Sequence, residues 1–263
     1  MIKQWQHYFV IALLAVGFGL FGALGYAPPP AVLAQQTLTR LGLPPETSQV
    51  LWVTSNDWSA TAGQLLRLEK QQNRWQVVGE GIPVRLGRKG MAWGLGLHHV
   101  SQTAFATLKK EGDGKAPAGI FSLGTSFGYA LQAPQRWQMP YRVASDYDYF
   151  VDAVDSPDYN QWRTLPANQA NDPQNHWSSF ERMRRTDQRY EYGLVINHNT
   201  DPITVGFGSA IFLHVWFDPA TPTSGCTAMA KDRVQDVLAW LKPSAHPLLV
   251  QAPWQAMTQL VMP

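Results

Sequence analysis

The segment IFLHVWFDPATPTSGCTAM, residues 211–229, joins a strand-like apolar run, a proline-rich turn and the only cysteine of the chain. In an extended strand, successive side chains point to opposite faces, so Phe212, His214 and Trp216 are predicted to share one face. The turn that follows can fold back on this strand. The segment therefore predicts that Cys226 returns to the face that carries His214.

A thiol beside an imidazole is a candidate site for acyl transfer. Only a few per cent of an ordinary thiol is ionised near neutral pH, and a neighbouring imidazole can remove the proton and later deliver it to a leaving amine. Gly225 would let the backbone approach a substrate carbonyl, and the N–H groups of Gly225 and Cys226 are candidate oxyanion donors. The alternative interpretation is structural: Cys226 as a small buried hydrophobe and His214 as a hydrogen-bonded core residue.

Composition limits the other kinds of function. The chain has 263 residues, of which 45% are hydrophobic, enough for one compact domain, and it is predicted to be a monomer. Lys and Arg (21) nearly balance Asp and Glu (19), which argues against nucleic acid as a partner. One cysteine allows no internal disulfide. The histidines lack metal-ligand spacing, and the acids of 152–158 fit neither a calcium loop nor a glycosidase pair, so we expect no metal and no cofactor.

The N-terminus has the features of an export signal. Lys3 precedes an uncharged stretch, 8–27, and Val32-Leu33-Ala34 offers a small-residue cleavage site. We predict a signal peptide over 1–34, with retention as a membrane anchor as the alternative because the apolar run approaches the ~20 residues of a spanning helix. A polar leader (35–47) and a catalytic domain (48–253) follow. The predicted location is the periplasm or cell envelope.

The remaining pattern predicts a mainly β protein. Strand character is present at 50–55, 119–123, 191–199 and 210–217, and a hairpin is predicted over 64–78 with its turn at Gln71-Gln72-Asn73. Residues 86–100 are interpreted as turns and residues 141–190 as long loops with little regular structure. Apolar residues at helical spacing predict a helix over 231–241, ended by Pro243.

Several stretches, in this order along the chain, resemble the L,D-transpeptidase family of the YkuD-like fold, in the branch with a His-Val-Trp strand before a Thr-Ser-Gly-Cys turn. The resemblance covers most of 50–242 and is carried by IPVRLGRKGMAWG (82–94), EGDGKAPAGIFSLG (111–124), SPDYNQW (156–162), ERMRR (181–185), YGLVINHN (192–199) and GSAIFLHVWFDPATPTSGCTAM (208–229). It implies a β-sandwich or barrel with short helices and long loops.

The same resemblance implies roles for residues. Cys226 would be the nucleophile and His214 the general base, oriented by the backbone carbonyl of Val215. The family acts on peptidoglycan stem peptides: it cleaves after the L-centre of diaminopimelate, releases D-alanine and passes the acyl group to an amine.

The chain departs from the better-known branch at two positions. Ser224 stands where a second histidine is usual, and Ala228 stands where an arginine or asparagine often follows the cysteine. A carboxylate anchor is therefore expected elsewhere, with Arg182, Arg184 and Arg185 as candidates and solvated surface charge as the alternative.

Further candidate substrate contacts are His198, which is expected on a neighbouring strand, Ser224, and the loop residues Tyr159 and Asn160. A plain hairpin residue is the alternative for His198, and ordinary loop chemistry is the alternative for Asn160.

Two other functions are compatible with these residues, and the chain order of His and Cys counts against a third. An L,D-carboxypeptidase or endopeptidase would use the same nucleophile with water as acceptor, and the choice depends on the dryness of the cleft and on an acceptor site. A catalytically disabled cell-wall-binding domain would keep the fold without the chemistry. Papain-like and NlpC-type peptidases usually place Cys before His in the chain, whereas here His214 precedes Cys226.

Overall fold

The computed structural model describes residues 30–99 and 108–262. The strands are β1 (Gln49–Ser55), β2 (Ala62–Gln71), β3 (Arg74–Arg85), β4 (Met91–Trp93), β5 (Ala116–Gly128), β6 (Tyr141–Val143), β7 (Asp148–Val151), β8 (Gln161–Thr164), β9 (Phe180–Arg182), β10 (Tyr192–Ile196), β11 (Phe212–Val215), β12 (Thr227–Met229) and β13 (Leu248–Pro253). The helices are α1 (Pro30–Leu41) and α2 (Lys231–Trp240), with 3-10 turns η2 (Pro173–Asn175), η3 (Gln188–Tyr190), η4 (Pro243–Ala245) and η5 (Trp254–Gln259).

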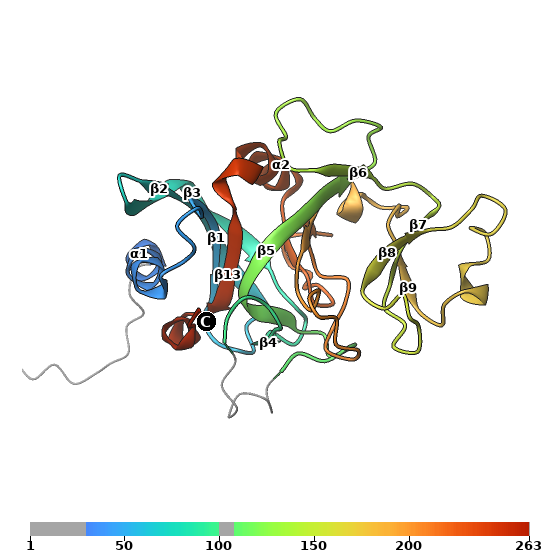
Figure 1. Cartoon of the computed structure of the whole chain (residues 1–263), viewed down its shortest axis with the longest axis horizontal. Helices are drawn as coiled ribbons and strands as arrows, with labels where there is room; N and C mark the ends of the chain where they lie inside the picture. Colours follow the sequence, from blue (N-terminus) through green and yellow to red (C-terminus); the bar gives the residue numbers. More distant parts are fainter. Residues whose placement is uncertain (1–29, 100–107, 263) are drawn as a thin grey trace, which may run out of the picture.

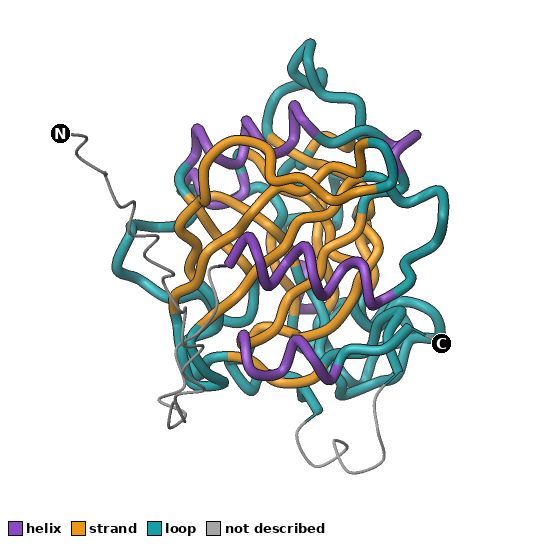
Figure 2. Tube along the Cα trace, turned by 90° about the vertical axis from the view of Figure 1, so that its left-hand side faces the viewer, coloured by secondary structure: helices purple, strands orange, loops and turns teal. Residues whose placement is uncertain are grey.

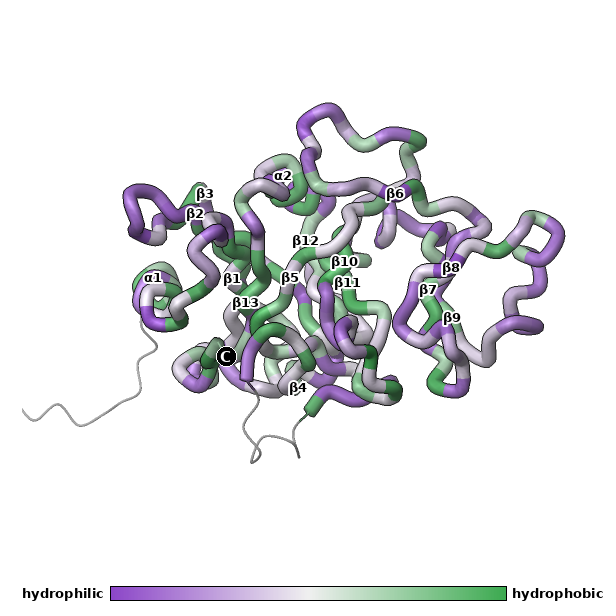
Figure 3. The backbone as a smooth tube through the Cα atoms, viewed as in Figure 1, coloured by the Kyte–Doolittle hydropathy of each residue, from purple (hydrophilic) through white to green (hydrophobic). Residues whose placement is uncertain are grey.

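The main sheet closes into a barrel. Its strands run in the order β10-β11-β12-β3-β2-β1-β13-β5, and β5 pairs again with β10 (Figure 1). Closure leaves no free edge along this ring. Within the described residues, hydrophobic colour is concentrated along barrel strands such as β1, β10 and β11, whereas much of the outer loops is hydrophilic (Figure 3). The predicted mainly β barrel with short helices is confirmed.

The closure depends on one long strand that changes partners. The first half of β5 (119–122) pairs with β13, and the second half (123–128) pairs with β10. Gly124 lies at the change. A Cβ there would approach Asn197 Oδ1 to 2.8 Å and Val195 Cβ to 3.2 Å, so this corner requires glycine.

The predicted hairpin and the predicted helix are both present. β2 and β3 pair antiparallel around a two-residue turn at Gln72 and Asn73, which adopt positive φ values of 47° and 64°. The α2 helix buries Val234, Val237 and Leu238 on one face. The run predicted as turns, 86–100, instead includes β4, which pairs with β5.

The middle of the chain is more regular than the sequence indicated. Strands β8, β7 and β9 form a separate three-stranded sheet within the stretch predicted as long loops. Asp148 fastens it: one carboxylate oxygen accepts hydrogen bonds from Trp162 Nε1 at 2.8 Å and Thr164 Oγ1 at 2.6 Å. Phe150 packs toward the barrel strand β11, whereas its neighbours Tyr149 and Val151 belong to a separate cluster. Successive side chains of β7 point to opposite faces, so Phe150 contacts the barrel while Tyr149 and Val151 pack on the other side. β7 thereby joins the small sheet to the barrel.

Helix α1 packs on the outside of the barrel. It lies across the strands on the face shown in Figure 2 and contacts β3 and η5. Leu33, Ala34, Leu38 and Leu41 are buried, and Arg40 donates to the carbonyl of Met257 at 3.1 Å. The predicted cleavage point after Ala34 therefore falls inside a packed helix that also includes the first part of the polar leader.

The predicted signal or anchor segment lies mostly outside the described residues, because 1–29 are not among them. Among the residues that the structure describes, no helix has the length and apolarity to cross a membrane. The export signal stays a prediction.

Candidate active site

Strand register places Cys226 and His214 on one face of the barrel wall. Strands β11 and β12 are parallel, with Leu213 opposite Thr227 and His214 opposite Ala228. One residue before these pairs in both segments, Phe212 lies beside Cys226, and the Phe212 N–H donates to the Cys226 Sγ at 3.3 Å. Residues at the same level of neighbouring strands point to the same face, and residues two apart on a strand are separated by about 7 Å. The imidazole therefore stands one side-chain position beyond the thiol.

The imidazole of His214 has a fixed tautomer. Its Nδ1 lies 2.7 Å from the carbonyl oxygen of Val215 and must donate, because a carbonyl only accepts. This leaves Nε2 as the unprotonated nitrogen. The ring meets that of Tyr190 edge to face, with centroids 5.2 Å apart. Burial lowers the pKa of His214 to about 4, and the charges of Arg189 and Arg185 lower it further, so the imidazole is neutral at pH 7.

Cys226 is buried in a mainly apolar cluster. It is 8% exposed and packs with Phe127, Phe150, Met183, Tyr190 and Phe212 among others. Burial raises the pKa of the thiol to about 12, and the nearby carboxylate of Glu181 raises it further. Its S–H donates weakly to the carbonyl of Ala210 at 3.5 Å. The resting thiol is therefore neutral, and any reaction requires a base to take its proton.

The turn before Cys226 is held by its own side chains. Thr223 Oγ1 donates to the Cys226 carbonyl at 2.7 Å and accepts the Gly225 N–H at 3.1 Å. The Gly225 N–H predicted to serve an oxyanion is thus already engaged. Gly225 fits here for a steric reason, because a Cβ would lie 3.0 Å from the carbonyl oxygen of Lys115. Ser224 is exposed beside it.

Two charged residues near the thiol had no clear signal in the sequence. Lys109 is 4% exposed and pairs with Asp113 at 2.9 Å, and a Cβ on Gly225 would lie 3.5 Å from its Nζ. Its charge lowers the pKa of Cys226. Glu181 accepts a hydrogen bond from Tyr190 Oη at 2.8 Å, and burial raises the pKa of Glu181. The only sequence signals were their positions beside or within EGDGK and ERMRR.

The predicted substrate contacts Asn160 and His198 instead connect backbone segments. Asn160 Nδ2 donates to the carbonyls of His198 at 3.1 Å and Asn199 at 2.7 Å, and its Oδ1 accepts the Ala210 N–H at 3.2 Å. His198 is 1% exposed: Nδ1 accepts the Leu95 N–H, and Nε2 lies 2.9 Å from the Phe207 carbonyl. Burial lowers the pKa of His198 to about 3. These side chains position the segment that leads into β11 and Cys226.

Tyr159 belongs to a neighbouring hydrogen-bond cluster. Its hydroxyl donates to Glu111 Oε2 at 2.6 Å, and Ser209 Oγ donates to the same oxygen at 2.7 Å. Burial raises the pKa of Tyr159, with the hydrogen bond to Glu111 adding to the shift. Of the four predicted substrate contacts, Tyr159, Asn160 and His198 are buried, and Ser224 faces solvent.

Asn160→Ala should therefore destabilise the fold strongly. The change leaves three buried backbone groups without a partner and puts alanine at a φ of 56°, which glycine and asparagine tolerate better. At about 1–3 kcal/mol for each lost partner, we expect the free energy of unfolding in urea to fall by about 3–5 kcal/mol. Asn197→Ala is the matched control, since Asn197 Nδ2 donates to Ser122 Oγ alone, and should cost less than about 1 kcal/mol. Equal losses in the two variants would contradict this role.

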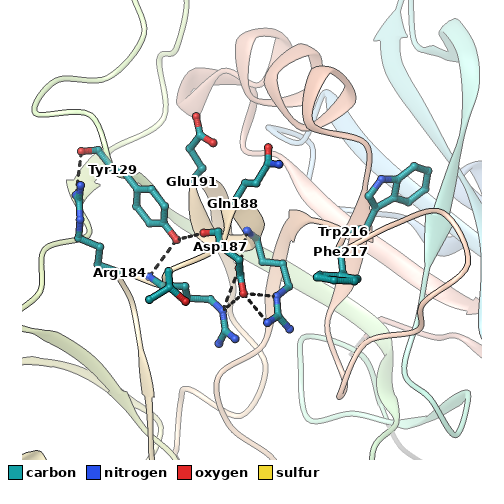
Figure 4. Close-up of a pocket in the computed structure, with 10 residues that line it drawn as sticks. Tyr129, Arg184, Asp187, Gln188, Glu191, Trp216 and Phe217 are labelled. Atoms are coloured by element: carbon teal, nitrogen blue, oxygen red, sulfur yellow. Dashed lines mark hydrogen bonds and ion pairs between the residues drawn. The ribbon is translucent and has the colours of Figure 1, made fainter.

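A pocket opens beyond His214. It has a volume of about 520 Å³ and is lined by Tyr129, Arg184, Arg185, Thr186, Asp187, Gln188, Arg189, Glu191, Trp216 and Phe217 (Figure 4). Two of the three predicted cations, Arg184 and Arg185, belong to it. The third, Arg182, instead packs over the rings of Tyr149 and Phe180 in the small sheet. Arg189 is a pocket cation that the sequence did not indicate.

In the part of the chain that the structure describes, no group of three or more His, Cys, Asp or Glu residues is arranged to hold a metal ion.

Comparison with known proteins gives the family. Residues 57–250 match the model of the L,D-transpeptidase catalytic domain, YkuD. Among solved structures, Bd1075 of Bdellovibrio bacteriovorus is 13% identical with a TM-score of 0.37, and the match covers 79% of this chain and 48% of the Bd1075 chain. The helical cell shape determining protein Pgp2 of Campylobacter jejuni is 12% identical with a TM-score of 0.34, and the match covers 83% of this chain and 54% of the Pgp2 chain. This chain thus spans about half the length of those proteins. No curated protein matches it. The family match covers most of the chain, which therefore belongs to the L,D-transpeptidase catalytic domain family.

Proposed function

We propose that this protein is a peptidoglycan L,D-transpeptidase in which Cys226 is the nucleophile and His214 the general base. The observation that carries the proposal is the His214 tautomer: the Val215 carbonyl holds the Nδ1 proton, which leaves Nε2 as the nitrogen that can accept one, and the ring stands on the same face as Cys226. A neutral imidazole one side-chain position beyond a neutral thiol is the proposed starting state for base-assisted attack.

The proposed reaction begins with attack on the stem peptide. His214 Nε2 takes the thiol proton as Sγ bonds to the carbonyl carbon at the L-centre of diaminopimelate. The imidazolium then gives this proton to the departing nitrogen of D-alanine, and a thioester remains on Cys226. An amine of a second stem attacks the thioester, the amine proton passes to His214, and the sulfur regains it as the new amide leaves. Water in place of the amine would give hydrolysis by the same steps.

The buried, protonated thiol is expected to react only when substrate is bound. With a pKa of about 12 and 8% exposure, Cys226 is unreactive until a peptide displaces its apolar neighbours and the base removes the proton in the same step. Peptidoglycan stem peptides lie outside the cytoplasm, which accords with the export predicted from the N-terminus.

The test is a mass-spectrometric assay of the full-length chain with diaminopimelate-containing tetrapeptide stems, with and without a second stem. We expect release of D-alanine, a covalent acyl-enzyme and cross-linked dimers when the acceptor is present. Tripeptide alone under both conditions would identify a hydrolase instead. Absence of any turnover or adduct would favour a wall-binding domain that has lost catalysis.

A further inference from the structure

The pocket beyond His214 continues the line of the two reactive groups. Along β11, Phe212 marks the level of Cys226, His214 comes two residues later, and Trp216, which lines the pocket, two residues after that. The Trp216 N–H still pairs with the Met229 carbonyl at 2.8 Å, so the strand alternation extends this far. The pocket therefore lies at the end of β11, past the levels of the thiol and the imidazole.

The pocket presents two guanidinium groups held by one carboxylate. Arg189 donates to Asp187 Oδ2 through Nε at 3.0 Å and Nη2 at 2.6 Å, and Arg185 Nε lies 3.3 Å from Oδ1 (Figure 4). Burial opposes ionisation of Asp187, but the hydrogen bonds and charges of the two arginines prevail and lower its pKa to about 2. The carboxylate therefore stays charged and keeps both guanidinium groups in place.

Both arginines keep donors for a ligand. A guanidinium has five N–H groups, and Asp187 takes two of Arg189 and one of Arg185. The second acid of the pocket, Glu191, is already paired with Lys231 at 2.8 Å. The pocket lining thus holds three arginines and two acids. Outside the lining, Arg184 also pairs with Asp146 at 3.8 Å and Arg185 Nη1 lies 3.6 Å from Glu181. Its other walls, Trp216 and the exposed ring of Phe217, are aromatic.

The chemistry of the proposed reaction determines which part of a peptide lies here. The imidazole must protonate the departing nitrogen, so the leaving amino acid lies on the His214 side of the scissile bond. Its α-carboxylate is bonded to the carbon next to that nitrogen, within about 4 Å of the scissile carbon. That carboxylate is directed from His214 toward the pocket that Arg185 and Arg189 line.

We propose that Arg185 and Arg189, clamped by Asp187, bind the α-carboxylate of the leaving D-amino acid, and of the acceptor amino acid that takes its place. This inference rests on the proposed function. It also accounts for Ala228, which is fully buried opposite His214 and leaves no cation after the cysteine. The anchor comes from the segment before β10 instead.

The test compares two tetrapeptide stems, one with a free C-terminal carboxylate and one with a C-terminal carboxamide, in the full-length chain. The wild type should favour the free acid in kcat/KM by roughly 10–100-fold, since charge-assisted bidentate hydrogen bonds are lost with the amide. Arg189→Gln and Arg185→Gln should each remove most of this preference, mainly through KM. The preference is the ratio of the two peptides in one variant, so an effect of the lost charge on the pKa of His214 acts on both peptides and cancels. Arg182→Gln, from the same segment but packed on Tyr149, is the matched control and should keep the preference.

The two proposals fail in different ways. Equal use of both peptides by the wild type, or equal losses on both peptides in the arginine variants, would overturn the carboxylate site while leaving the transpeptidase assignment intact. No turnover of either peptide by the wild type would overturn the assignment itself.

Discussion

A Cys226→Ala variant should lose acyl-enzyme formation completely and peptide turnover by about 10⁴-fold or more, because removing a covalent nucleophile removes the whole reaction path. The variant should stay folded. The side chain is small and buried in an apolar cluster, so replacing the thiol with a hydrogen atom leaves only a small cavity that costs about 1 kcal/mol. Intact-protein mass after incubation with tetrapeptide, together with urea unfolding, measures both quantities.

Two further variants make the result interpretable. Cys226→Ser keeps nearly the same volume but offers a much weaker nucleophile, and it should be as inactive as the alanine variant. Gln169→Ala changes an exposed side chain outside the site and should leave turnover within about twofold. If the alanine variant still releases D-alanine at the wild-type rate, Cys226 is a structural residue and the proposed chemistry is wrong.

The second large effect is loss of stability in mild acid. Burial lowers the pKa of His98 to about 4, of His198 to about 3 and of His214 to about 4. The folded protein therefore keeps these rings neutral while the unfolded chain protonates them below about pH 6.5. The contribution of the three neutral rings to the free energy of unfolding is fully present above that pH, and it falls as the pH decreases toward 4. Each ring contributes about 2 kcal/mol between pH 7 and 5, so we expect a total loss of about 4–6 kcal/mol.

Urea unfolding at pH 7 and at pH 5 measures this loss. His98→Leu should reduce the difference between the two pH values by about a third, whatever its effect at pH 7, because one titrating group is gone. The matched control is His176→Gln, which replaces an exposed histidine and should leave the difference unchanged. The acids with lowered pKa, such as Asp187 at about 2, titrate below this window. Burial raises the pKa of Glu181, so protonation of this carboxyl on acidification works against the loss. Equal stability at the two pH values would show that these histidines are protonated in the folded state.

The parts of the fold that depend on local pattern were predictable from the sequence. Alternation of apolar residues around Gln72 and Asn73 specified the hairpin, and helical spacing of Val234, Val237 and Leu238 specified α2. The small sheet was missed because its strands have three or four residues, too few for a period to emerge. These short strands are stabilised by contacts between residues far apart in the sequence. Asp148 on β7 accepts hydrogen bonds from Trp162 and Thr164 on β8.

The candidate site shows the same division. The strand pattern and the resemblance put Cys226 with His214, and the register of β11 and β12 places them on one face. Sequence could show that Asn160 lies in a loop, but not that its amide turns inward to hold the backbone. Lys109 and Glu181 were missed for a related reason. Only the tertiary fold brings their charges close enough to influence the thiol.

Helix α1 has a consequence for orientation. It packs at one end of the long axis of the molecule, whereas the small sheet lies at the other end (Figure 1). The reactive face of β11 is directed toward that small sheet, through Phe212 and Phe150. The chain therefore enters α1 at the end of the molecule opposite the small sheet, and the reactive groups are directed away from that end.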